Sequence, residues 1–319
     1  MTQRVSILVP SYGRPASLAR CLAALESQTH PPDEVVVGVR AGDDETIQVA
    51  ESARARGLPL RVATTPVAGV VASMQAALDA ASGDLIALTD DDARPRAGWI
   101  EGLLACFAAS PDVGGVGGRD WQPTERWNER RVGQVQWFGR VIGNHHLGAG
   151  PARDVDVLKG ANCAFRAPLL RAVGFDRRLR GEGAQMYWEL GVCLPLRRAG
   201  WRLIYDPEVA VDHDVAPRHG DDHLHRGVFA EAPLRNAIHN ETTELLEGRG
   251  VMSRALFLGW AFLVGTREGP GLAQLARHVL RGRPNALDRW RAAVAGRLAG
   301  AATARRVPRH LTVPPPPSA

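Results

Sequence analysis

The first part of the chain alternates short apolar runs with segments whose apolar residues recur every three to four positions. The runs have the length and composition of buried strands, and they cover residues 5–9, 35–39, 60–63, 85–88 and 113–118. The spaced segments predict helices at residues 17–25, 46–57, 70–81 and 95–109. Ser17 is expected to cap the first helix. This alternation predicts an α/β fold with a mostly parallel, doubly wound sheet flanked by helices.

The apolar run at Leu85–Leu88 is followed closely by the aspartates Asp90, Asp91 and Asp92. In open parallel sheets, ligands bind at the carboxyl ends of strands, and clustered carboxylates there can hold a divalent cation. Aspartates are also common in turns and at helix caps. The pattern alone leaves both interpretations open.

Composition narrows the class of protein. The chain has 319 residues, 45% hydrophobic and 23% charged, enough for one large or two smaller cores. Its cysteines form no C-x-x-C pair, which excludes a typical zinc or disulfide framework and favours a reducing cytoplasm. Residues 1–9 predict a strand instead of a secretory signal. The net charge of +5 permits an acidic partner such as a nucleotide phosphate or an anionic lipid.

A set of stretches, in order along the chain, carries a resemblance to a known family. They are Val5–Arg14, Gly83–Asp92, Lys159–Arg166, Val173–Asp176 and Arg197–Pro207. Together they resemble family 2 glycosyltransferases with the GT-A fold, a Rossmann-like sheet that binds a nucleotide sugar. The resemblance implies a nucleotide-sugar-binding half at 1–120 and an acceptor-binding half at 121–225. A helical, basic extension with a disordered proline-rich tail is expected at 226–319.

For the donor, the resemblance implies that the first strand and its turn hold the nucleotide. It places Pro10, Tyr12 and Arg14 beside the base and the phosphates, with a solvated turn as the alternative for Arg14. Asp84 either makes a hydrogen bond inside the nucleotide pocket or belongs to the turn that starts its strand.

The residue that reads the base in the family is an acid after the second strand, and this chain departs from that pattern. Arg40 stands where the acid is expected. Either Asp43 or Asp44 substitutes from nearby, or both are solvated loop acids. The resemblance therefore leaves the nucleotide base open.

For the metal, the resemblance assigns Asp92 to direct coordination of Mn or Mg on the diphosphate. It assigns Asp90 to the ribose or to the metal, and His213 to completion of the metal site. Asp91 is expected to be structural. Such a cation stabilises the charge that develops on the leaving nucleoside diphosphate. An imidazole is a less natural ligand for Mg than for Mn, so His213 favours Mn.

For the acceptor, counting back without gaps from Arg197–Gly200 places Trp188 and Glu189 on the acid pair of the family. Glu189 becomes the general base, which a sugar hydroxyl needs to act as a nucleophile. The alternatives are a helix-start acid favoured by the helix dipole, and Glu182 as the competing base. Trp188 and Asn162 are expected on the acceptor side, although Asn162 alternatively satisfies local backbone groups.

The last part of the chain differs in character. The apolar run at 255–264 is shorter than a bilayer-spanning helix, and arginines follow it among leucines and alanines. This region either lies peripherally on the inner face of a membrane or packs on the catalytic domain. The tail at 313–319 is expected to be extended and mobile.

The function expected from this resemblance is an inverting, metal-dependent glycosyltransferase in the cytoplasm. It would use a nucleoside-diphosphate sugar and a glycan, lipid-linked or small-molecule acceptor. The alternative is a catalytically impaired subunit that binds nucleotide sugars, supported by Arg40 and the altered acid pair. A nucleic-acid-binding protein would explain none of the acidic cluster, so no nucleic acid is expected as a partner.

Overall fold

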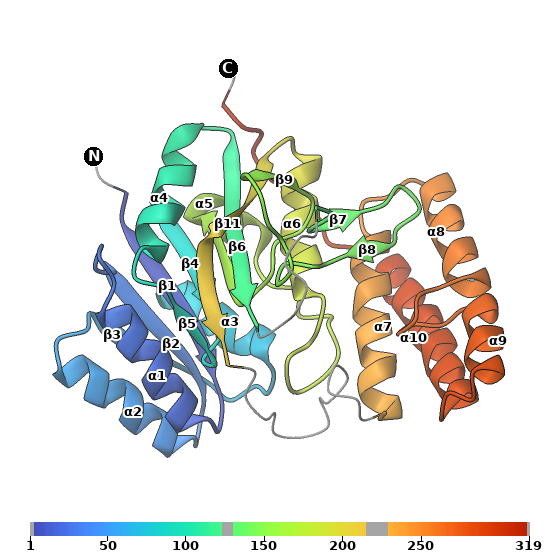
Figure 1. Cartoon of the computed structure of the whole chain (residues 1–319), viewed down its shortest axis with the longest axis horizontal. Coiled ribbons are helices and arrows are strands. Elements are labelled where there is room, and N and C mark those ends of the chain that lie inside the picture. The colour runs from blue at the N-terminus through green and yellow to red at the C-terminus, as the bar shows by residue number, and fades with distance from the viewer. Residues whose placement is uncertain (1–2, 123–129, 215–228, 318–319) are drawn as a thin grey trace.

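The computed structural model describes residues 3–122, 130–214 and 229–317. The strands are β1 Val5–Ser11, β2 Glu34–Arg40, β3 Leu60–Thr65, β4 Leu85–Thr89, β5 Ala93–Pro95, β6 Val113–Trp121, β7 Gln134–Val135, β8 Val141–Ile142, β9 Arg153–Val155, β10 Asn162–Arg166 and β11 Arg202–His213. The helices are α1 Pro15–Glu26, α2 Asp44–Ala55, α3 Val70–Ala80, α4 Trp99–Ala109, α5 Ala167–Val173, α6 Trp188–Arg198, α7 Glu231–Leu246, α8 Val251–Leu263, α9 Leu272–Leu280 and α10 Ala286–Arg306. Figure 1 shows the sheet with helices on both faces and α7 to α10 beside it.

The strand order of the main sheet is β3-β2-β1-β4-β10-β6-β11-β5, with β9 paired to β11. Strands β3, β2, β1 and β4 are parallel, as the sequence predicts. Strand β10 runs antiparallel between β4 and β6, a direction that an apolar run does not encode. As a result, the carboxyl ends of β1, β2, β4, β6 and β11 and the amino end of β10 meet at one edge.

Each face of the sheet has its own apolar core. On one face α1, α2 and α4 pack against alternate residues of β1, β2 and β4. On the other face the core includes residues of α3, α5 and α6, together with residues of α7 and α8. This is the doubly wound arrangement expected from alternating strands and helices.

A few elements differ from the prediction. Helix α1 begins at Pro15, which suits the first turn, so Ser17 is buried inside the helix instead of capping it. Helix α4 begins at Trp99, after the short strand β5. Strand β11 is much longer than the apolar segment Val209–Val211, because a register shift after Asp206 lets it continue past a proline.

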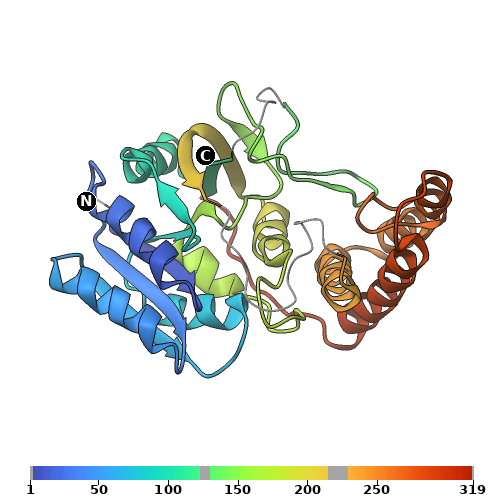
Figure 2. The ribbon, with the colours of Figure 1, turned by 60° about the horizontal axis from the view of Figure 1, so that its bottom comes forward.

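Helices α7 and α10 form the centre of the carboxyl-terminal extension. A side chain at Gly296 would place its Cβ 2.6 Å from the Arg235 carbonyl oxygen, and one at Gly300 would lie 2.5 Å from that of His239. These glycines therefore allow the close approach of the two helices. Helices α8 and α9 lie at the end of the molecule opposite β3 (Figures 1 and 2). Within the described ranges, no helix has both the length and the apolar character needed to cross a bilayer.

The tail after α10 is extended, as expected, but it packs against α6 and the loop between α6 and β11. Arg309 Nη1 donates to the Gly191 carbonyl at 3.0 Å. Trp201 Nε1 donates to the Pro314 carbonyl at 2.7 Å. Figure 2 shows the tail crossing from the helices to the sheet. The sequence predicted a mobile tail and did not predict these contacts.

Candidate active site

Asp90, Asp92 and His213 meet at the carboxyl edge of the sheet. The two aspartates follow β4, and His213 ends β11. A carboxylate oxygen from each aspartate and a ring nitrogen of His213 all lie within 4.8 Å of one another. Carboxylate oxygens suit Mg and Mn, and a neutral imidazole is an acceptable Mn ligand. The donor set that the sequence singled out therefore fits a divalent cation.

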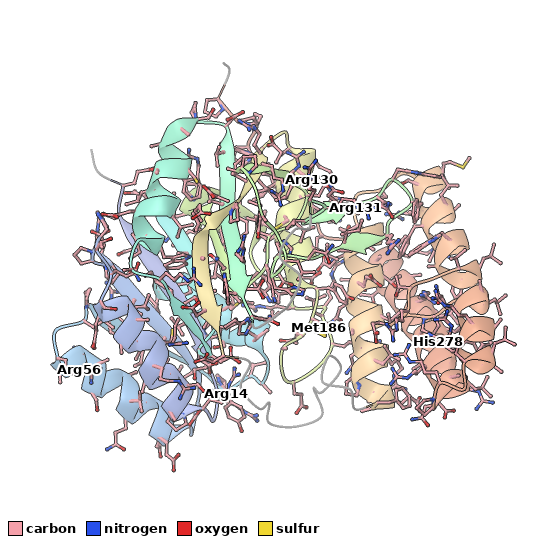
Figure 3. All side chains as sticks on the ribbon, viewed as in Figure 1. Arg14, Arg56, Arg130, Arg131, Met186 and His278 are labelled. Carbon is pink, nitrogen blue, oxygen red and sulfur yellow. The ribbon has the colours of Figure 1, made fainter. Side chains whose placement is uncertain are left out.

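Arg14 is held next to this cluster by two carboxylates. Its Nη2 lies 2.6 Å from Asp91 Oδ1, and its Nη1 lies 3.0 Å from Asp92 Oδ2. Asp91 is fully buried, and Ser11 Oγ donates to it at 2.7 Å. Burial raises the pKa of Asp91 to about 7, although Arg14 and Ser11 act in the opposite direction. Asp91 thus anchors Arg14 (Figure 3) from inside the protein.

His213 connects the cluster to a second acid, Asp120, that the sequence analysis missed. His213 Nε2 lies 3.3 Å from Asp92 Oδ1, and its Nδ1 lies 3.5 Å from Asp120 Oδ2. Burial lowers the pKa of His213, but the two carboxylates outweigh it and raise that pKa to about 9. The ring must therefore lose a proton before it can ligate a metal.

Asp120 is fully buried near the end of β6 and forms an ion pair with Lys159. Burial favours a high pKa for this carboxyl, but His213 and Lys159 outweigh burial and hold the pKa well below its usual range. The signal for Asp120 was present in the sequence. It follows the buried run 113–118 just as Asp90 follows 85–88.

Glu189 lies in the first turn of α6, where ungapped counting placed it. Its Oε1 accepts a hydrogen bond from Gly160 N at 3.2 Å. Desolvation raises the pKa of this carboxyl, partly offset by backbone hydrogen bonds, and nearby Asp90 raises it further. Glu182 is exposed in the loop that precedes α6. Of the two candidate bases, Glu189 is therefore the one whose carboxyl group interacts with Asp90 of the cluster.

The loop before α6 is fixed to the start of α3. Gln185 Oε1 accepts from Val71 N at 3.0 Å, and Val70 N donates to the Gly183 carbonyl at 2.9 Å. Gln185 and Tyr187 have φ angles of +39° and +71°, which are uncommon for residues with a side chain. These contacts hold a strained segment directly before Glu189.

On the nucleotide side, Tyr12 and Arg40 lie together at the ends of β1 and β2. The Arg40 Cζ atom is 5.4 Å from the centre of the Tyr12 ring, and Tyr12 is half-exposed. Pro10 is buried in β1 and pairs with Gly38 of β2. Tyr12 and Arg40 thus form a solvent-facing surface beside Arg14.

Asp43 and Asp44, the two candidates to replace the base-reading acid, differ in their surroundings. The Asp43 carboxylate accepts from Gly13 N at 2.6 Å and from Thr46 Oγ1 at 2.7 Å, so it caps α2 and holds the β1 turn. Asp44 is exposed at the first position of α2. Asp43 therefore has a structural role that neither of the two sequence interpretations included, whereas Asp44 is solvated.

Two further predicted site residues, Asp84 and Asn162, lie away from the Asp90–Asp92–His213 cluster or are buried. Asp84 is exposed at the start of β4, at the opposite edge from Asp90, and it accepts from Arg4 N at 2.9 Å. Asn162 is fully buried, accepts from Trp99 Nε1 at 2.8 Å and donates to backbone carbonyls. Asp84 lies at the wrong edge of the sheet for a nucleotide contact. Asn162 is buried, and its amide group already makes its hydrogen bonds within the protein. Both positions favour the alternative given for each residue over the nucleotide role of Asp84 and the acceptor role of Asn162.

Trp188 also belongs to the core. It is buried, and its ring lies 5.4 Å from that of Phe175 in an edge-on arrangement. A Cβ atom at Gly160 would lie 2.4 Å from the Trp188 ring. Trp188 therefore supports the turn that contacts Glu189, and this corrects its assignment to the acceptor.

Comparison with curated proteins gives relatives that are glycosyltransferases. Over 223 residues, 66% of this chain and 69% of the relative, the chain is 26% identical to a glucosyl-dolichyl phosphate glucuronosyltransferase from Haloferax volcanii. It is 29% identical over 220 residues to a pre-mycofactocin glycosyltransferase from Mycobacterium tuberculosis, covering 67% of this chain and 44% of that relative.

Comparison with solved structures supports the fold. A mannosyltransferase from Pyrobaculum calidifontis, solved with GDP-Man and Mn2+, has a TM-score of 0.59 at 20% identity, covering 96% of this chain and 88% of that one. TarS from S. aureus, solved with UDP-GlcNAc, has a TM-score of 0.55 at 17% identity, covering 96% and 93%. The fold is that of the GT-A glycosyltransferases.

The family model described as glycosyl transferase family 2 matches residues 6–174, more than half of the chain. This range includes β1 with Arg14, and β4 with Asp90 and Asp92. Glu189 and His213 lie beyond it. The chain belongs to glycosyl transferase family 2.

Proposed function

We propose that this enzyme transfers a sugar from a nucleoside-diphosphate sugar to a hydroxyl of a glycan, lipid-linked or small-molecule acceptor, with inversion at the anomeric carbon. The carrying observation is the convergence of Asp90, Asp92 and His213 within 4.8 Å at the carboxyl edge. The Pyrobaculum mannosyltransferase that binds GDP-Man and Mn2+, and TarS that binds UDP-GlcNAc, support this class of donor.

The cluster provides the site for the leaving diphosphate. Asp92 and His213, with Asp90 beside them, would hold Mn or Mg, and the cation when bound supplies a Lewis acid to the developing negative charge. Arg14, anchored by Asp91, presents a guanidinium next to the same position. Guanidinium groups bind phosphate oxygens well, so Arg14 adds a fixed positive charge.

Glu189 is the general base in this proposal. As the acceptor oxygen bonds to the anomeric carbon and the bond to the diphosphate oxygen breaks, the hydroxyl proton moves to the Glu189 carboxylate. Attack from the face opposite the leaving group inverts the configuration. The raised pKa of Glu189 strengthens it as a proton acceptor, and the Gly160 N–H orients it.

The base of the nucleotide contacts Tyr12 and Arg40 in this proposal. A guanidinium only donates hydrogen bonds, whereas the acid expected at this position only accepts them. Arg40 therefore selects a base edge that presents acceptor atoms. The Asp43 carboxylate is occupied by Gly13 and Thr46 and leaves this role to Arg40.

We propose that the reaction takes place at the cytoplasmic face of a membrane. All four cysteines are free thiols, which suits a reducing compartment. The Haloferax relative is named for a dolichyl phosphate-linked sugar, and the carboxyl-terminal helices of this chain expose apolar residues. Peripheral contact would bring the enzyme to a lipid-linked acceptor.

The test measures Mn-dependent turnover of a panel of nucleotide sugars by the wild type, Asp92→Ala, Glu189→Gln and Glu182→Gln. We expect Asp92→Ala to lose turnover and Glu189→Gln to lower kcat by about 10²- to 10⁴-fold while nucleotide binding persists. Glu182→Gln is the matched control and should retain turnover. Binding without turnover by the wild type would favour the impaired-subunit alternative, and absence of any binding would refute both.

A further inference from the structure

Helix α9 turns its apolar face toward solvent. Leu272, Val279 and Leu280 are 51%, 61% and 87% exposed, and exposed Ala276 lies between them on the same side of the helix. His278, on the opposite side, is buried and its Nε2 contacts Arg283 Nη1 at 2.9 Å. In a soluble protein the apolar stripe of a helix normally faces the core. The reversed orientation of α9 therefore indicates an interaction surface.

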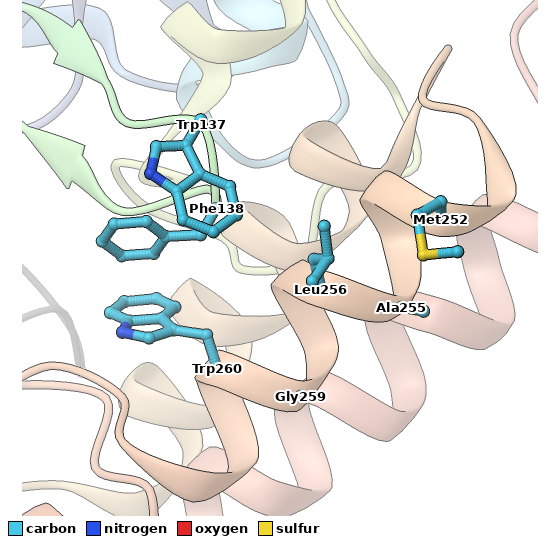
Figure 4. A pocket seen from close by; sticks show the side chains of 7 residues that line it. All are labelled: Trp137, Phe138, Met252, Ala255, Leu256, Gly259 and Trp260. Carbon is cyan, nitrogen blue, oxygen red and sulfur yellow. The ribbon is translucent and has the colours of Figure 1, made fainter.

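An apolar groove lies between neighbouring α8 and the β7–β8 hairpin. It has a volume of about 600 Å³, and Figure 4 shows the side chains that line it. They are Trp137, Phe138, Met252, Ala255, Leu256, Gly259 and Trp260. Trp137 is 75% exposed and Met252 73% exposed. The Phe138 ring, 5.0 Å from that of Trp260, holds the hairpin against α8.

The same part of the chain carries a surplus of positive charge. Between residues 249 and 291 there are eight arginines and two acids, Glu268 and Asp288. This surplus of six exceeds the net charge of +5 of the whole chain. The net positive charge therefore lies in the carboxyl-terminal part of the chain, which includes the helices that expose the apolar residues.

We propose that α8, α9 and the Trp137–Phe138 hairpin tip form a docking surface for a membrane of anionic phospholipids. Leu280, Val279 and Met252 enter the boundary between headgroups and acyl chains. The exposed arginines of this region bind lipid phosphates, and they are Arg267, Arg277, Arg281 and Arg291. An exposed tryptophan at the rim suits the same boundary. A second copy of the chain is disfavoured as occupant, because two surfaces of equal positive charge repel each other.

This proposal deepens the membrane contact of the proposed function, and it can fail independently of glycosyl transfer. The test is co-sedimentation of the full chain, without nucleotide sugar, with vesicles of phosphatidylcholine alone or mixed with phosphatidylglycerol. We expect the wild type to bind the mixed vesicles about tenfold or more tightly than the neutral ones, with binding that weakens as salt is added.

The key variant is Val279→Glu with Leu280→Glu, whose exposed positions leave the fold intact. It should weaken binding to the mixed vesicles by about tenfold or more. Val67→Glu is the matched control, because Val67 is 59% exposed and lies far from α9 on the loop between β3 and α3. Arg277→Gln with Arg281→Gln should reduce binding to the mixed vesicles and leave binding to neutral vesicles unchanged.

Several results would overturn the proposal. One is a wild type that binds neither kind of vesicle. Another is equal binding by the α9 variant and the Val67→Glu control. A third is a dimer, detected by light scattering, that the α9 variant dissociates, because it would assign the surface to a second copy. Turnover of nucleotide sugar in the same preparations reports separately on the proposed function.

Discussion

At the scale of single residues, Asp120 is the group through which His213 is oriented. Its carboxylate lies 3.5 Å from His213 Nδ1 and pairs with Lys159 on its other side. An acid behind a ligating imidazole fixes the ring so that the other nitrogen faces the metal. Asp120 would be a positioning residue in the proposed metal site, because His213 lies between it and Asp92.

Asp120→Asn should therefore weaken metal binding. The amide keeps the size of the side chain but loses the charge that holds both His213 and Lys159, and we expect Mn2+ affinity to fall by about 10- to 100-fold. Electron paramagnetic resonance of unbound Mn2+ measures this without turnover. Asp154→Asn, at the exposed ion pair with Arg202, is the matched control. Equal Mn2+ affinity in both variants would contradict the positioning role.

Residue patterns predicted part of this site. The acids at the end of a buried run drew attention to Asp90 and Asp92, and the family resemblance gave them a metal role. The same resemblance assigned Glu189 from its distance to the end of α6, and these roles stay predictions. Asp84 was misassigned although its place before the run 85–88 already puts it at the edge opposite Asp90. Asn162 was misassigned because a sequence motif does not show whether the hydrogen bonds of a side chain are already used within the fold.

At the scale of elements, the strand–helix alternation predicted the parallel half of the sheet but not the direction of β10. A buried strand has the same apolar run in either direction, and only its partners distinguish them. The antiparallel direction matters for the site. It places the amino end of β10 beside Thr89 of β4, and so brings Lys159 and Gly160 to the edge where Asp120 and Glu189 lie.

The contact between α6 and α7 contains a buried acid that makes stability depend on pH. Glu244 of α7 packs against Gly191 of α6, where a Cβ atom would lie 2.6 Å from its Oε1. Burial raises the pKa of Glu244 well above its usual value, and neighbouring Asp176 raises it further. The charged groups that face it are Asp176, Arg178, Arg198 and Arg309. Burial therefore favours the protonated form of Glu244 in the folded state.

Because unfolding lowers this pKa to about 4.3, the unfolded chain releases the proton and stability falls as pH rises toward the folded pKa. Glu244→Gln stays neutral and removes this loss. Between about pH 4.3 and the folded-state pKa of Glu244, the unfolding free energy of this variant should rise relative to that of the wild type by about 1.4 kcal/mol per pH unit. Urea denaturation from about pH 5 to pH 8 measures the difference. Wild-type and variant stability curves that stay parallel over this pH range would contradict the assignment.

At the scale of the whole molecule, the tail connects the carboxyl-terminal helices to the catalytic domain. Arg309 donates to the carbonyls of Val173, Gly174 and Gly191, and thereby links α5 and α6. Further along, the Pro314 carbonyl accepts from the buried Trp201. The tail thus packs behind the helix whose first turn carries Glu189.

Arg309→Ala should destabilise the protein by about 2 to 3 kcal/mol, because it removes charge-assisted hydrogen bonds and leaves carbonyl groups at the ends of α5 and α6 without these donors. The readout is the urea midpoint, together with the rate at which protease cleaves the tail. Arg305→Ala, at an exposed position near the end of α10, is the matched control and should change neither. If both variants unfold at the same midpoint, the tail contributes little to stability, and the packing of α7 and α8 holds the two parts of the molecule together.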